Sequence, residues 1–361
     1  MIKGVRYYRN HELLRKNSSF LRAIRRKKRK KKMRGCPNSI KNQIKFNRKY
    51  WDFVKIKAPN NFSIVENEEG TLGFIREIKE SYGHKKKTFI NLHSITHITN
   101  DALLLLLSNM VRFRAKRIPF DGNFPKNKNC RRIVMNSGFL ESLYDDIKSD
   151  NSYYLQGRTC SFHTHANKRV DQKMTDIIIE KAAQTIWGEP RRCPKVQRTF
   201  IELMQNTNNH AADIQGGKHW WLSVSHDPIN KKVVMSFLDF GKGIFRSLEG
   251  KKPEDKFYHW REVIKKYWPL VKSNDKKFEL ILQGALYKDQ PVTVTRDYKR
   301  GKGLPGIYTA LQKNDIQNLV IISNNVYANV SKNDYHVMSN EFDGTFVSWE
   351  MNESINSLPW M

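Results

Sequence analysis

The stretch KVQRTFIELMQNTNNHA, Lys195–Ala211, decides the fold of the second half of this chain. Its apolar residues, Phe200 among them, recur at helical spacing and predict an amphipathic helix with one buried face. Glu202, Asn206 and His210 follow one another at intervals of four residues on a neighbouring face. Because residues four apart lie above one another on a helix, a carboxylate, an amide and an imidazole are expected to point into one cleft.

A second segment, VVMSFLDFGKGI at residues 233–244, predicts a strand that ends at Asp239. Gly241 and Gly243 follow the carboxylate. Since glycine has no Cβ, these positions let the backbone turn tightly and leave room for a planar ligand beside Asp239.

Two further segments extend the pattern. RGKGLPGI, residues 300–307, precedes the helical sequence YTALQKN. Glycines before a helix expose backbone N–H groups that bind phosphate, and Lys302 adds a cation. GTFVSWE, residues 344–350, predicts a terminal strand after a glycine turn.

In this order the four segments resemble the GHKL (histidine kinase-like, Bergerat-fold) ATPases, which include gyrase-type, mismatch-repair, chaperone and histidine-kinase domains. IELMQNTNNHA matches the N box, DFGKGI and RGKGLPGI match the two glycine boxes, and GTF matches the closing motif, over about 150 residues. The resemblance implies a helical layer on a mixed sheet, with ATP between helices and a mobile lid. In style the motifs are most similar to the anti-sigma branch and to bacterial ATP-binding proteins that join such a domain to a STAS-like one.

The resemblance also implies a role for each motif residue. It assigns Asn206 to a Mg²⁺ ion that bridges the phosphates, and Mg²⁺ prefers hard oxygen ligands. It assigns Asp239 to the adenine amino group, and Glu202 to the general base that activates water in the hydrolysing branches. The remaining expected contacts are Gly241 and Gly243 beside the base, Gly301, Lys302 and Gly303 at the phosphate lid, Thr345 at the adenine end and His210 near the phosphates.

The first half predicts a small α/β domain, since strand-like and helix-like segments alternate over residues 51–165. Asn100 and Asp101 are expected to cap the helix that begins ALLLLL. INLHSITHITNDALLLL (90–106) and IVMNSGFLESL (133–143) resemble STAS domains of anti-sigma antagonists. Those domains carry an Asp-Ser pair with a phosphorylated serine where this chain has Thr99 and Asn100. The resemblance therefore implies a contact or regulatory domain without that phosphorylation cycle, unless Thr96 or Thr99 takes the phosphate.

The chain of 361 residues has a formal net charge of +30, and residues 1–50 alone carry 19 Lys or Arg and one Glu. In residues 22–34, 10 of 13 side chains are cationic. Such a run predicts an arm that binds RNA or DNA phosphates. The alternative interpretation is a solvated basic helix that docks on an acidic partner or keeps the chain soluble.

Four scattered cysteines without a close pair indicate a reducing compartment. The longest apolar run, Ala102–Leu107, is far shorter than the roughly 20 residues that cross a bilayer. We therefore expect a cytoplasmic protein without a membrane anchor.

The expected architecture is α/β: a basic helical arm (1–50), a STAS-like α/β domain (51–165), a GHKL α/β sandwich (166–352) and a tail (353–361). The expected function is an Mg-ATP-gated ATPase that hydrolyses slowly and switches a protein partner. One alternative is an anti-sigma-type protein serine/threonine kinase acting on a STAS partner. Another is a nucleic-acid-binding protein regulated by ATP. Whether the chain forms a homodimer stays open.

Overall fold

The computed structural model of the chain describes residues 49–144, 160–165, 172–210, 220–249 and 303–359, together with residues 43, 46 and 47. The chain divides into two compact units, Met1–Phe53 and Val54–Met361. The basic arm expected over residues 1–50 lies almost wholly outside the described residues. No described helix has the length and apolar character needed to cross a membrane.

The second unit opens with alternating strands and helices, as the sequence predicts. Three strands form a parallel sheet in the order β1-β3-β5, and the short strands β2 and β4 pair in parallel beside it. β5 covers Asp121–Asn123, which the sequence interpretation placed in a turn. The elements are β1 (Val54–Lys57), β2 (Asn61–Phe62), α3 (Glu68–Gly83), β3 (Thr88–Asn91), β4 (His97–Ile98), α4 (Asn100–Ala115), β5 (Phe120–Asn123), α5 (Lys128–Asn136) and α6 (Phe139–Tyr144).

The start of α4 differs from the expectation. Its N-cap residue is Thr99, whose side chain makes no capping hydrogen bond, and Asn100 already lies inside the helix. The Asn100 amide instead donates from Nδ2 to Oγ of Ser225 at 2.8 Å. The expected capping role of Asn100 is therefore wrong, because its side chain joins α4 to the second sheet of the unit.

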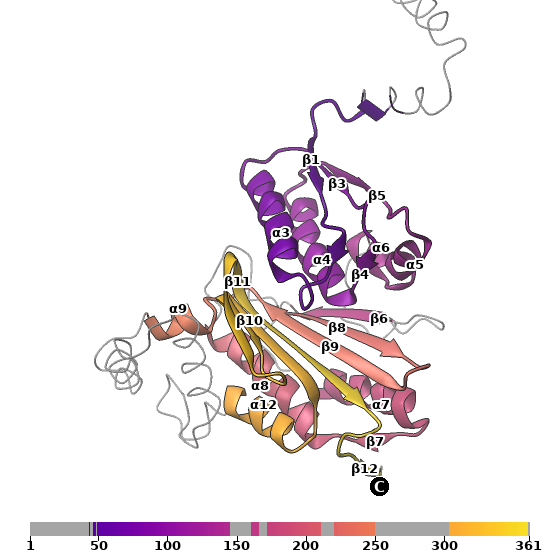
Figure 1. Cartoon of the computed structure of the whole chain (residues 1–361), viewed down its shortest axis with the longest axis vertical. Helices are drawn as coiled ribbons and strands as arrows, with labels where there is room; N and C mark the ends of the chain where they lie inside the picture. The colour runs from indigo at the N-terminus through magenta and orange to yellow at the C-terminus, as the bar shows by residue number, and fades with distance from the viewer. Residues whose placement is uncertain are drawn as a thin grey trace, which may run out of the picture. The chain divides into compact units, whose positions relative to one another are not determined.

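That second sheet has five strands in the order β10-β11-β9-β8-β6 (Figure 1). All pairings among these described strands are antiparallel, whereas the resemblance implied a mixed sheet. Because β6 pairs with β8, residues 160–165, which the sequence interpretation placed in the first α/β domain, form an edge of this five-stranded sheet. The strands are β6 (Cys160–His165), β8 (Trp220–Asp227), β9 (Lys232–Asp239), β10 (Gln317–Asn329) and β11 (Asp334–Asn352).

Helices and a short two-stranded pairing complete this half. β12 pairs with β7, so the expected tail at 353–361 contributes a strand. Figure 1 shows α7, α8 and α12 together on one side of the five-stranded sheet. The elements are α7 (Gln172–Trp187), β7 (Arg191–Arg192), α8 (Pro194–His210), α9 (Ile244–Glu249), α12 (Gly303–Gln312) and β12 (Leu358–Pro359).

The five-stranded sheet is buried on both faces. On β9, Met235 and Phe237 enter a core with α7, α8 and α12, whereas Leu238 enters a second core with α3 and α4. Successive side chains of a strand point to opposite faces, so Asp239 continues the face of Phe237, toward the helices. The sheet is therefore the middle of three layers, and the end of β9 presents its carboxylate on the side of α8 and α12.

Candidate functional site

The packing of α8 fixes the direction of its polar residues. Phe200 and Met204 are completely buried, as the sequence predicts, and the Phe200 ring contacts Trp349 of β11 at 5.1 Å between ring centroids. This contact fixes the rotation of the helix about its axis. Glu202 is only 9% exposed and Asn206 is half-buried one turn later.

Glu202 is a buried carboxylate with one oxygen paired and the other without a partner. Its Oε1 accepts a hydrogen bond from Nε of Arg198 at 2.7 Å. Oε2 is buried and has no hydrogen-bond partner among the described residues. A Cβ added to Gly306 of α12 would lie 2.9 Å from this Oε2. The start of α12 thus passes close to the carboxylate, and a glycine at 306 makes that approach possible.

Asp239 ends β9 as the sequence predicts. Its Oδ1 accepts the backbone N–H of Gly241 at 2.7 Å. Burial raises the pKa of this carboxyl to about 6, although the N–H groups of Gly241 and Thr345 counteract part of the rise. Thr345 lies directly opposite Asp239 on β11, and Trp220 lies opposite it on β8. A carboxyl group in this position gains stability from a bound hydrogen-bond donor.

Gly344 lies inside β11 rather than in the turn that the sequence interpretation placed before this strand. Its φ is +126°, and a Cβ at this position would lie 1.9 Å from the carbonyl oxygen of Asp239. No side chain fits there, so the glycine allows the segment after Asp239 to pass across β11.

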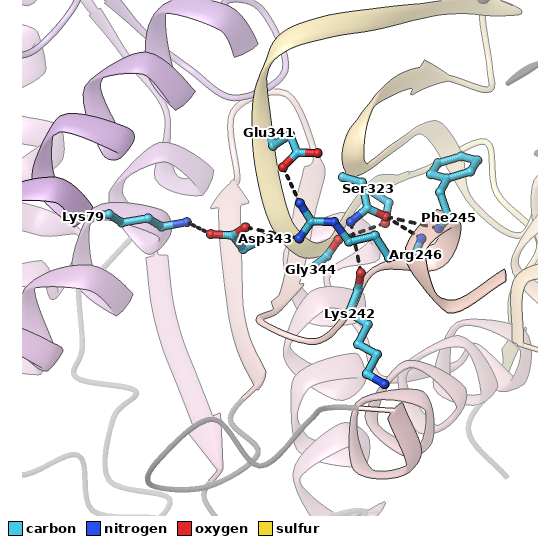
Figure 2. A network of polar contacts seen from close by, with 9 residues as sticks. Lys79, Lys242, Phe245, Arg246, Ser323, Glu341, Asp343 and Gly344 are labelled. Carbon is cyan, nitrogen blue, oxygen red and sulfur yellow. Dashed lines mark hydrogen bonds and ion pairs between the residues drawn. The ribbon is translucent and has the colours of Figure 1, made fainter. Parts of the chain in front are cut away.

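Sequence reasoning missed the residues that receive this segment on β10. Ser323 accepts the backbone N–H of Ile244 at 2.8 Å. The same Oγ donates to the carbonyl oxygen of Gly344 at 2.9 Å (Figure 2). Asn324 follows it. The only sequence signal for this pair is the polar interruption SNN in an otherwise apolar strand pattern.

Gly243 has a different environment from the expected one beside a base. Its φ is +76°, and a Cβ added to it would lie 2.5 Å from Oδ1 of Asn324. The missing side chain at 243 therefore makes room for the Asn324 amide. Glycine is required here both by the backbone conformation and by this contact.

Not every expected site residue can be located. Gly301 and Lys302 lie outside the described residues, as does the side chain of His210, while Gly303 is the first residue of α12. Within the described ranges no three His, Cys, Asp or Glu side chains cluster in a way that could hold a metal ion. Asn206 remains the candidate ligand for Mg²⁺.

No protein-family model and no curated protein sequence matches this chain.

Proposed function

We propose that this chain binds ATP with Mg²⁺ in the manner of GHKL ATPases, hydrolyses it slowly, and uses the nucleotide as a conformational switch that regulates a protein partner. The observation that carries the proposal is the placement of separate motifs on the same, helix-facing side of one sheet. Asp239 and Thr345 are neighbours there, and Glu202 on the covering helix meets Gly306 of the second glycine segment.

The residues fit a magnesium nucleotide on two counts. The half-buried carboxyl of Asp239 has a pKa raised by desolvation and suits a bound donor such as the adenine amino group. The Oε2 atom of Glu202, without a partner in the described part of the chain, suits a bound water. Asn206 would offer its amide oxygen to Mg²⁺. When bound, ATP supplies the phosphoanhydride bond and Mg²⁺ neutralises phosphate charge.

The chain's own contribution to hydrolysis is the placement of a base. Arg198 holds Oε1 of Glu202, so the other oxygen has a defined direction beside the start of α12. Oε2 would take a proton from the attacking water, a role that requires a carboxylate within hydrogen-bond reach. Because residue 306 is a glycine, α12 approaches Oε2 without placing a side chain against it.

The position of the STAS-like loop favours water over this chain's own loop as the phosphate acceptor. Thr99 Oγ1 donates a hydrogen bond to the carbonyl oxygen of Phe62 at 3.4 Å. The Asn100 side chain donates a hydrogen bond to Ser225 on β8. Ser225 is five residues along β8 from Trp220, which pairs with Asp239, a separation of about 16 Å along the strand. Transfer to a separate STAS protein remains the alternative to be tested.

The decisive experiment follows labelled γ-phosphate from ATP with the full chain, Mg²⁺ and a STAS protein. We expect free phosphate as the product. Glu202→Gln should reduce its release by about 100-fold or more while ATP affinity stays within about threefold. Glu180→Gln is the matched control, because it changes an exposed carboxylate on α7.

Each contrary result has a defined meaning. A wild-type chain that does not bind ATP contradicts the proposal as a whole. Unchanged hydrolysis in Glu202→Gln excludes Glu202 as the base. Label on the STAS protein in place of free phosphate identifies a kinase.

A further inference from the structure

Two neighbouring buried side chains of β10, Ser323 and Asn324, hold the far end of the segment that follows Asp239, and Asn324 makes three of the four hydrogen bonds. After Asp239 the chain crosses β11 at Gly344 and reaches β10, where α9 begins with Ile244. The shape of this segment determines where Gly241 lies, and the N–H of Gly241 donates a hydrogen bond to the Asp239 carboxyl. A residue that fixes the far end therefore also fixes the edge of the proposed base site.

Asn324 occupies this anchoring position in an unusual backbone conformation. It is 2% exposed and has a φ of +54°. The register of β10 against β11 shifts on both sides of it. Asparagine tolerates the left-handed region better than most residues, and a bulge redirects a side chain out of the regular pattern. The local distortion turns the amide toward the segment that crosses β11.

The amide makes three hydrogen bonds to the backbone of this segment. Oδ1 accepts the N–H groups of Phe245 and Arg246 at 3.2 and 3.3 Å. Nδ2 donates to the carbonyl oxygen of Lys242 at 3.0 Å. The first N–H groups of a helix have no partner within the helix, so one side chain here satisfies two of them from another strand.

Exposed ion pairs nearby contribute less. Arg246 pairs with Glu341 and, at 3.8 Å, with Asp343, and Asp343 pairs with Lys79 of α3 at 2.9 Å (Figure 2). The side chains of Arg246, Glu341 and Asp343 are about half exposed, and such pairs add little stability. The buried amide of Asn324, with both of its polar atoms bonded, is the stronger constraint on the segment.

We propose that Asn324 is a positioning residue that sets the preference of the site for adenine over guanine; this rests on the proposed function. Adenine presents an amino donor where guanine presents a carbonyl oxygen. A carboxylate accepts a hydrogen bond from the amino group of adenine and repels the carbonyl oxygen of guanine. Discrimination between the two bases therefore depends on a fixed position of the Asp239 carboxylate. Asn324 fixes it by holding residues 242–246, while the phosphate contacts come from other segments.

Asn324→Gly is the direct test, because glycine keeps the left-handed backbone and removes only the amide. The measurement is the ratio of the dissociation constants for GTP and ATP. We expect this ratio to fall about tenfold or more, as the loss of buried hydrogen bonds to the segment predicts. Asn318→Gly is the matched control, since Asn318 also lies on β10 with a φ of +50° but is exposed. It should leave the ratio unchanged.

Hydrogen exchange supplies a readout that is independent of nucleotide. The amides of Phe245 and Arg246 should lose protection in Asn324→Gly and keep it in Asn318→Gly. Asn324→Asp keeps the acceptor oxygens but cannot donate to Lys242, so it should restore part of the protection and part of the ATP preference. This variant also provides the test if Asn324→Gly does not fold.

The outcomes separate the two proposals. A wild-type chain without ATP binding contradicts the proposed function. A wild-type chain that prefers ATP, with a preference unchanged in Asn324→Gly and Asn324→Asp, overturns the role of Asn324 and leaves the proposed function intact.

Discussion

Replacing Asp239 by asparagine should make the nucleotide-free protein more stable at neutral pH and weaken the ATP binding that we propose. The pKa of this carboxyl is about 6 in the folded chain, against an ordinary value of 3.8. The folded state favours the protonated form of Asp239. The stability that this residue contributes is therefore fully present below about pH 4 and is lost as pH rises through 6. At pH 7.5 ionisation then costs up to about 3 kcal/mol.

Asparagine has no charge to bury but offers one acceptor oxygen instead of two. Since the N–H groups of Gly241 and Thr345 both act on Asp239, part of the gain is lost, and we expect a net stabilisation of about 1–2 kcal/mol. In a unit of this size that raises the melting temperature by about 2–6 °C.

The assay compares thermal unfolding of wild type and Asp239→Asn without nucleotide at pH 7.5 and pH 5. The advantage of the variant should shrink at the lower pH. The ATP affinity of the wild type should also fall below pH 6. Subtracting the pH dependence of ATP affinity measured for Asp239→Asn removes the contribution of the phosphates' own titration. A variant that is less stable than wild type at both pH values would refute this reasoning.

Two further predictions concern the packing around the site. Gly344→Ala should destabilise the chain by more than about 3 kcal/mol in thermal unfolding, because its Cβ would lie 1.9 Å from the Asp239 carbonyl oxygen. Gly188→Ala is the control. Gly188 has a φ of +74° but open space around it, so this substitution should cost about 1 kcal/mol. Glu69→Gln should lower the free energy of unfolding by about 1 kcal/mol at pH 7. The Glu69 carboxylate accepts the backbone N–H groups of Ser339 and Asn340. These hydrogen bonds hold the pKa of Glu69 below 4.5 despite the opposing effect of burial. Stability from a lowered pKa is present above the ordinary value and lost as pH falls, so the two unfolding curves should converge in acid.

The helical period of α8 and the apolar run of β9 could be predicted from the sequence, because each element buries one continuous face. Phe200 is buried and β9 ends at Asp239, as the local pattern indicates. The same local reasoning placed Asn100 in a cap and Gly344 in a turn, and both were wrong. Their roles depend on Ser225 and on the Asp239 carbonyl, which lie far away in sequence.

Asn324 shows the same limit more clearly. Nothing in its neighbourhood along the chain indicates that its amide caps α9 from another strand, since the partners are 78 to 82 residues away. Local periodicity predicts elements, whereas the contacts between elements at the candidate site arise only when the sheet brings the segments together.

The burial of the five-stranded sheet on both faces means that the two halves of the second unit are not exchangeable modules. Trp221, Leu238 and Phe346 of the sheet share a core with α3 and α4. A fragment cut at residue 166 would lose those helices and the edge strand β6, and would expose this apolar surface to water. The two halves should therefore melt together in a single cooperative transition, and a substitution in either half should change the stability of both.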